Sequence, residues 1–211
     1  MTLIGSTNSG NNGMNATSIA VAHPKIGRAG PSRGRVAMFA LIAAEAAIFT
    51  IFVTAYLFYV GKSLTGPVPN DVLNVPMFYT ICLLSSSLTI HLAAKALGRA
   101  KVRGFGVWWF LTIALGGTFI YGTVSEWHRL IYHDGLRIST NLFGTTYYSL
   151  VGLHGFHVVV GLIALSMVMA LALLGKMKSE HAERVDILSL YWHFVDTVWV
   201  VVFTVVYVIG R

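Results

Sequence analysis

The chain has 211 residues, of which 55% are hydrophobic and only 11% are charged. A soluble domain of this size carries roughly 25% charged residues, so the composition excludes an ordinary soluble fold and indicates an integral membrane protein. The net charge of +7 does not indicate nucleic-acid binding, because the basic residues flank the apolar runs, where they can contact anionic lipid headgroups.

The first 34 residues are rich in Gly, Asn, Ser and Thr. They have no apolar face with which to form a core, so residues 1–34 are predicted to be a flexible N-terminal arm on the cytoplasmic side. The only cysteine, Cys82, lies within an apolar run. It cannot form an intrachain disulfide, and a packing role is the interpretation we favour.

Five apolar segments follow the arm, at about 36–60, 72–97, 106–127, 146–174 and 188–210. Each is long enough to cross a hydrocarbon core of ~30 Å as a helix, which needs about 20 residues. Helices are favoured over irregular structure because every backbone polar group must be paired within the lipid. Residues 35–211 are therefore predicted to form one all-α transmembrane domain of five helices, with no internal repeat.

The basic residues give the orientation of the five segments. With the N-terminus in the cytoplasm, eleven Lys and Arg fall inside and four fall outside. This positive-inside bias places the C-terminus on the outer side. The inner residues are Lys25, Arg28, Arg33, Arg35, Lys95, Arg99, Lys101, Arg103, Lys176, Lys178 and Arg184, and the outer ones are Lys62, Arg129, Arg137 and Arg211.

Ionisable residues within the apolar segments are the candidate functional residues, because each costs about 2.5–3.5 kcal/mol near the bilayer centre. They are Glu45, His91, Glu126, His154, His157, His193 and Asp196. For Glu45 two interpretations stay open. One is a satisfied hydrogen bond to a neighbouring helix, and the other is a part in proton or lipid traffic.

Helical spacing groups these polar residues into two stripes that are expected to face the bundle interior. The fourth segment carries Tyr147, His154, His157 and Gly161, and the fifth carries His193, Asp196, Trp199, Phe203 and Tyr207. The histidines and Asp196 are acceptable iron or zinc ligands. However, the two groups are expected at different depths, so helix-to-helix hydrogen bonds are the favoured interpretation and no metal is expected.

Aromatic and small residues complete the pattern. Trp127, Trp192 and Trp199 are expected as interface aromatics, and Trp108, Trp109, Tyr147 and Tyr148 are expected in the aromatic belts at the membrane surfaces. Small residues are expected to mark close helix contacts. They occur at Ser85–Ser87, Gly116-Gly117 and Gly152-x-x-Gly155.

Several motifs resemble subunit III of the haem–copper terminal oxidases. The last segment contains Trp192-His193-Phe194-Val195-Asp196-Thr197-Val198-Trp199, which is similar to that family's Trp-His-Phe-x-Asp-x-x-Trp signature. The resemblance extends over about 36–210. Its other parts are His154-Gly155-Phe156-His157, Glu126-Trp127, Glu45 and the Ser-rich run Leu84–Thr89.

The chain departs from that family in two respects. Many members have seven helices, and this chain lacks the first two. Where the family often has a His-His pair after the Ser-rich run, this chain has Ala94-Lys95, with His91 slightly earlier. We therefore expect no role in this chain for the family's His-His pair.

The resemblance implies a non-catalytic subunit of a proton-pumping oxidase in a bacterial inner membrane. Such a subunit binds no haem or copper itself, since these belong to partner subunits. Subunit I is the expected main partner, with subunit II, a small subunit IV or a larger supercomplex as further candidates. The helices are expected to divide into a first pair and a last three around a lipid-filled cleft. Phospholipid there, together with the intramembrane acids and histidines, would support proton uptake by subunit I.

Other functions stay open from the sequence. Within the same family, the chain could serve a quinol oxidase or act as an accessory to a nitric oxide reductase. In other classes, it could be a proton-coupled transporter or a di-haem membrane cytochrome built on the histidines. Transporters commonly show broken helices or repeats, and neither is apparent here.

Overall fold

A computed structural model describes residues 32–62, 66–67, 69–176 and 181–210 of the chain. The predicted N-terminal arm lies almost wholly outside the described residues, so its structure remains a prediction. Only its last residues are described. Ser32 is the N-cap of the first helix, and its side chain accepts a hydrogen bond from the backbone N of Arg35 at 3.4 Å.

The described residues contain five helices that are long and apolar enough to cross a membrane. This confirms the predicted all-α fold with five spans. In chain order the elements are α1 (Arg33–Tyr59), the short α2 (Pro69–Val72), α3 (Met77–Gly98), α4 (Val102–Tyr132), α5 (Leu142–Leu173) and α6 (Ala182–Phe203), which continues as a π-helical turn, η2 (Thr204–Ile209).

The helix ends differ from the predicted ends where the apolar pattern and the backbone disagree. The second span begins at Met77 rather than at 72, because Pro76 stands at its N-cap. The third span covers Val102–Tyr132 rather than 106–127. The end of an apolar run in the sequence marks the edge of the hydrocarbon core, whereas the helix itself can continue through the polar headgroup region.

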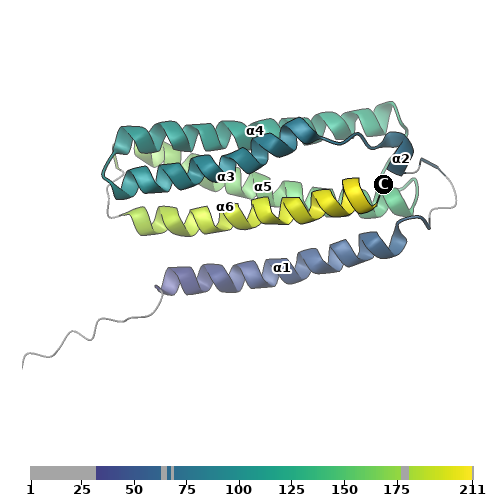
Figure 1. Cartoon of the computed structure of the whole chain (residues 1–211), viewed down its shortest axis with the longest axis horizontal. Helices are drawn as coiled ribbons and strands as arrows, with labels where there is room; N and C mark the ends of the chain where they lie inside the picture. The colour runs from purple at the N-terminus through teal and green to yellow at the C-terminus, as the bar shows by residue number, and fades with distance from the viewer. Residues whose placement is uncertain (1–31, 63–65, 68, 177–180, 211) are drawn as a thin grey trace, which may run out of the picture. The chain divides into compact units, whose positions relative to one another are not determined.

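Four of the helices pack into a closed ring, and α1 lies outside it. Helix α3 packs along α4, α4 along α5, α5 along α6, and α6 back against α3. Helix α1 packs on α5 and α6. In Figure 1, α6 lies between α1 and the pair α3 and α4. The first residues of α1, α4 and α6 and the last residues of α3 and α5 lie at one end, which we call the basic end.

The expected division of the helices into a first pair and a last three is not shown. The second spanning helix, α3, stands with α4 and α6 rather than with α1. The reason lies in side-chain pairing, since α3 supplies Thr80, Ser86 and Ser87 as hydrogen-bond partners of residues on α6. Helix α1 makes no comparable contact with α3.

Glycines allow the ring to close around one tryptophan. A Cβ atom on Gly116 of α4 would lie 2.9 Å from the Trp192 ring, and one on Gly161 of α5 would lie 2.8 Å from it. These glycines therefore let three helices approach closely. Gly152 faces Trp127 in a similar way, but Gly117 and Gly155 have open space around them, so only part of the predicted small-residue contacts is confirmed.

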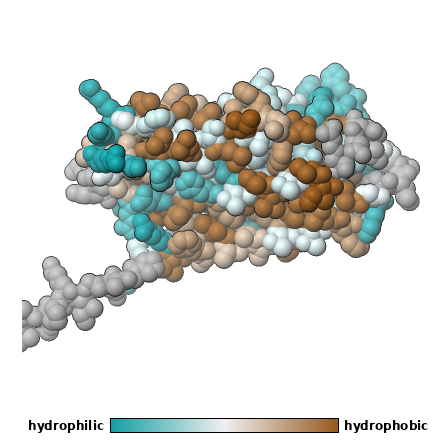
Figure 2. Space-filling model, in the orientation of Figure 1, coloured by the Kyte–Doolittle hydropathy of each residue, from teal (hydrophilic) through white to brown (hydrophobic). Residues whose placement is uncertain are grey.

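The surface of the described residues is largely apolar, as Figure 2 shows for one face. Large hydrophobic side chains such as Ile51, Phe78, Phe110 and Phe156 are more than half exposed. Exposed side chains of this kind on every spanning helix fit an environment of lipid tails rather than water.

Candidate functional site

Glu45 and His157 join the peripheral helix α1 to α5. His157 Nε2 lies 3.1 Å from Glu45 Oε2, and the two side chains are 8% and 23% exposed. His157 Nδ1 lies 2.8 Å from the carbonyl oxygen of Leu153. Because a carbonyl oxygen can only accept a hydrogen bond, Nδ1 carries a hydrogen. The hydrogen bond between Nε2 and Glu45 therefore contains a single proton, which is bound either to the imidazole or to the carboxyl group. The pair satisfies both groups inside the membrane.

His154 lies one helical turn from His157 but in a wholly aromatic setting. It is fully buried, and its ring centroid is 4.9 Å from that of Trp199 and 5.7 Å from that of Phe119. Neither ring nitrogen has a hydrogen-bond partner among the described residues. His154 therefore packs as an aromatic ring and takes no part in the pair between α1 and α5.

Ser87 of α3 connects the two polar residues of α6. Its hydroxyl donates to Asp196 Oδ2, and its oxygen lies 3.1 Å from His193 Nδ1. Asp196 is 3% exposed, and its second oxygen, Oδ1, has no partner. His91 of α3 is exposed beside this group and lines the same cavity as His193. The group stands near the middle of α3.

The predicted interface position of two tryptophans is wrong. Trp192 and Trp199 lie in the core, 0% and 1% exposed. The indole of Trp192 donates to Ser86 at 2.8 Å, and that of Trp199 donates to Thr80 at 3.2 Å. A tryptophan can be buried when its N–H finds an acceptor, and the hydroxyls of α3 supply one. Trp127 is only partly buried, near the other end of the bundle.

Three of the residues expected in the aromatic belts, Trp109, Tyr147 and Tyr148, are also buried. Trp109 is 0% exposed and donates to the carbonyl of Leu165, and Tyr147 is 0% exposed. The polar-stripe prediction accounts for Tyr147, since its face of α5 points into the bundle together with His154, His157 and Gly161, as expected. In the last span, Asp196 and Trp199 on α6 and Tyr207 on η2 are buried likewise, whereas His193 and Phe203 are partly exposed.

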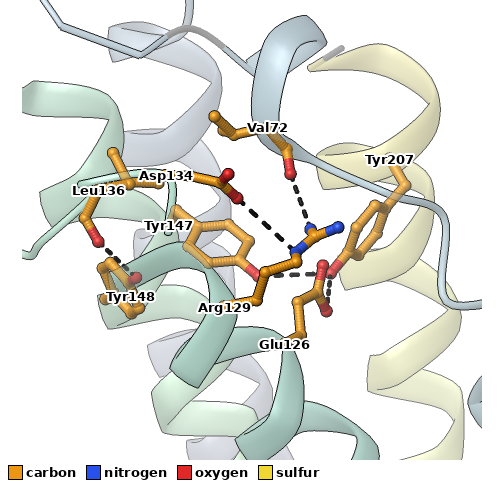
Figure 3. Close-up of polar contacts among 8 residues, drawn as sticks. All are labelled: Val72, Glu126, Arg129, Asp134, Leu136, Tyr147, Tyr148 and Tyr207. Atoms are coloured by element: carbon orange, nitrogen blue, oxygen red, sulfur yellow. Dashed lines mark hydrogen bonds and ion pairs between the residues drawn. The ribbon is translucent and has the colours of Figure 1, made fainter. Parts of the chain in front are cut away.

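Glu126 belongs to a third polar group, at the end of the bundle opposite the basic end (Figure 3). Its Oε2 accepts a hydrogen bond from the Tyr207 hydroxyl at 3.0 Å, and that hydroxyl lies 3.4 Å from the Tyr147 hydroxyl. Arg129, on the same helix, donates to the Val72 carbonyl at 2.9 Å and pairs with Asp134 at 3.7 Å. The group joins α4, α5 and the π-helical turn.

The structure thus separates the seven candidate residues rather than gathering them. Glu45 pairs with His157, Asp196 and His193 meet at Ser87, Glu126 pairs with Tyr207, and His154 is enclosed by aromatic rings. In the described ranges, no three His, Cys, Asp or Glu side chains come together as a metal ion requires. Each acid instead bonds to a different helix, which is an arrangement that holds helices together.

Sequence reasoning missed the partners of these acids. The sequence predicts Ser87 as a small packing residue and as part of the Ser-rich family run, yet Ser87 bonds two residues that are more than one hundred positions away. Thr80 and Ser86 were not singled out as acceptors for buried indoles. No local pattern identifies such partners, although a hydroxyl on an otherwise apolar helix is a signal that a polar group on a neighbouring helix needs pairing.

Comparison with known proteins identifies a family. The family model for cytochrome c oxidase subunit III matches residues 32–211. Cytochrome c oxidase subunit 3 of Thermostichus vulcanus is 32% identical over 92% of this chain and 95% of its own length. The subunit 3 proteins of cytochrome c oxidase from Alkalihalophilus pseudofirmus and of quinol oxidase from Bacillus subtilis are 33% and 29% identical, over 79% and 80% of this chain and 82% and 83% of their own lengths.

The family match covers every described helix, and the match to the Thermostichus vulcanus protein covers 95% of that protein's length. The motifs that first indicated the resemblance lie on α1, α3, α4, α5 and α6, where they supply the interhelical pairs described above. The chain therefore belongs to the cytochrome c oxidase subunit III family.

Proposed function

We propose that this chain is a non-catalytic subunit of a proton-pumping haem–copper terminal oxidase in aerobic respiration, with cytochrome c as the electron donor of the complex. Its role is to stabilise subunit I, which holds the redox centres and is its main contact, and to support proton uptake there. The observation that carries the proposal is that its intramembrane acids each bond a neighbouring helix. Residues used in this way fix a scaffold.

We place the chain in a bacterial inner membrane, with the basic end on the cytoplasmic side. Among described residues, this end carries Arg33, Arg35, Lys95, Arg99, Lys101, Arg103, Lys176 and Arg184, whereas Lys62, Arg129 and Arg137 lie toward the opposite end. The bias supports this orientation through the positive-inside rule. The N-terminus is then cytoplasmic, and the C-terminus faces the outer side.

A phospholipid is the ligand we propose for this chain. Between α1 and α6 runs an apolar crevice of about 270 Å³, lined by residues that include Phe49, Val53, Phe194 and Val201. An acyl chain fits such a surface, because it needs no hydrogen-bond partners. Haem and copper are assigned to the partner subunits. The crevice lies between the outlying helix and the four-helix ring, whereas the resemblance implies a cleft between the first two helices and the last three.

The test is to purify the complex in a mild detergent through an affinity tag on this chain, and to identify what accompanies it by mass spectrometry and optical spectroscopy. We expect a haem-bearing and a copper-bearing membrane subunit, phospholipid, and oxygen consumption by the complex. Recovery of the chain without any haem protein would overturn the proposal and favour a transporter. A haem band from the isolated chain would favour the di-haem cytochrome.

A quinol oxidase is the second candidate, because quinol oxidase subunit 3 of Bacillus subtilis is 29% identical to this chain. The donor is chosen on other subunits, so the same purified complex must decide. Oxygen consumption driven by reduced cytochrome c supports the first candidate. Consumption driven only by a quinol supports the second.

A further inference from the structure

A polar cavity opens at the basic end of the bundle, in the groove between α1 and α3, with α6 as its floor. Its volume is about 420 Å³. Arg35 and Asp186 stand at its mouth as an ion pair at 3.5 Å, and His91, Ser189 and His193 line it further in. Figure 2 shows hydrophilic residues among apolar ones between this end and the middle of the visible face.

Polar groups continue from the floor of the cavity to the middle of the membrane. His193 contacts Ser87, and Ser87 donates to Asp196, which lies one helical turn further from the basic end. Asp196 is only 3% exposed, and its Oδ1 has no hydrogen-bond partner among the described residues. This row of polar side chains, which consists of His193, Ser87 and Asp196, therefore ends on a buried carboxyl oxygen that still needs a hydrogen bond.

Beyond Asp196 the row is closed by aromatic packing. Trp199 lies one turn further along α6, donates its N–H to Thr80 and stacks against His154. Phe119 packs against both Trp199 and His154. Neither ring nitrogen of His154 has a hydrogen-bond partner among the described residues, so no hydrogen bond continues the row toward the opposite end. The hydrogen bonds that begin at His193 therefore end at Asp196.

We propose that this cavity is a blind, water-filled inlet that leads from the basic end of the bundle to His193, from which Ser87 connects to Asp196 at mid-membrane by hydrogen bonds. Its ligand is water, and the side of the membrane on which it opens rests on the orientation proposed above. A cavity of this volume has room for about ten waters, and five of the eight residues that line it carry polar side chains.

Water suits the inlet better than an acyl chain does. The exposed His91 and the partly exposed His193 line the cavity, and a lipid tail offers neither of them a hydrogen-bond partner. The neighbouring crevice between α1 and α6 is apolar, so lipid and water are assigned to separate parts of the groove.

Through His193 and Ser87, the inlet connects Asp196 with one side of the membrane only. Water at His193 can exchange a proton with the imidazole, and the hydrogen bonds from His193 to Ser87 and from Ser87 to Asp196 lead from there to the carboxyl group. The Arg35–Asp186 pair at the mouth is exposed and joins α1 to α6, so it can set the width of the opening.

Single-cysteine labelling of the intact complex in membranes tests the inlet. Cys82, which is buried, is first replaced by Ser to remove the native thiol. Ser189→Cys and Ser87→Cys then place a thiol at the cavity and near its inner end. The matched control is Leu88→Cys, because Leu88 is the next residue of α3, at nearly the same depth, and is 62% exposed on the outer surface. A membrane-impermeant thiol reagent is added to either side.

We expect Ser189→Cys to react fastest and Ser87→Cys more slowly. Both should react on the order of tenfold faster than Leu88→Cys, because a thiol ionises in water but not in lipid. The reaction should occur only from the side that holds the basic end. Ser87→Cys and Ser189→Cys reacting no faster than Leu88→Cys would overturn the inlet. If Ser87→Cys and Ser189→Cys react faster than Leu88→Cys only when the reagent is added to the outer side, the result would support the inlet and overturn the proposed orientation.

Discussion

Helices α1 and α6 have similar hydrophobic sequences but very different positions in the fold. Helix α6 buries nine residues, among them Trp192, Asp196 and Trp199, whereas α1 buries only Phe49 and Tyr56. Polar partners for α6 come chiefly from α3, and the one buried polar contact of α1 is Glu45 with His157. Position in the bundle, rather than hydrophobicity, thus decides how much each helix contributes to the fold.

The largest effect is expected at the glycine contacts around Trp192. Gly161→Leu would force side-chain atoms into the Trp192 ring, whereas Gly155→Leu, on the same helix, enters open space. We expect Gly161→Leu to destabilise the bundle by about 1–3 kcal/mol through overpacking. The measurement is the thermal midpoint of the solubilised protein by circular dichroism. Equal midpoints for the two variants would show that α6 is not the tightly packed centre.

Asp196→Leu comes next, because it removes the partner of Ser87 and leaves polar groups of α3 and α6 unpaired. We expect a loss of about 1–2 kcal/mol, looser packing of the last helix and weaker attachment to subunit I. Asp196→Asn is the control, since its amide oxygen can still accept from Ser87. Unchanged assembly and oxygen consumption in Asp196→Leu would contradict the assigned role.

Glu45→Leu is expected to have a smaller and more local effect. It removes the contact with His157, worth about 0.6–1.7 kcal/mol for a hydrogen bond within the membrane. Helix α1 should loosen while the four-helix ring stays folded, which limited proteolysis and amide hydrogen exchange can separate. The control is Thr54→Val, because Thr54 bonds only to its own helix. If the whole bundle melts in Glu45→Leu, α1 is not peripheral.

The smallest effect is expected for Tyr207→Phe. This change removes the hydroxyl between Glu126 and Tyr147 but keeps the ring, at a cost of about 0.5–1.5 kcal/mol. The thermal midpoint should fall slightly, and hydrogen exchange should increase near the C-terminal end of the last helix. Tyr121→Phe serves as the control, because Tyr121 is 69% exposed. A larger loss than for Asp196→Leu would reverse the ranking of these two polar groups.

The sequence by itself determined the class of the protein, the number of spanning helices and the faces of α5 and α6 that point inward. These follow from local properties, namely the length of apolar runs, helical periodicity and the high cost of charge in lipid. Motif order also indicated the family, which the comparisons then showed. The predicted helix ends were less accurate, for example at Met77, because the apolar pattern and the helical backbone end for different reasons.

Only the tertiary structure decided which helices are neighbours and which polar groups meet. Ser87 and Asp196 are 109 positions apart, and nothing along the chain joins them. The tertiary structure also places Trp192 and Trp199 in the core rather than at an expected interface, because hydroxyls of α3 accept hydrogen bonds from their indole N–H groups. In lipid, apolar surfaces do not discriminate between neighbouring helices, so small residues and paired polar groups select the contacts.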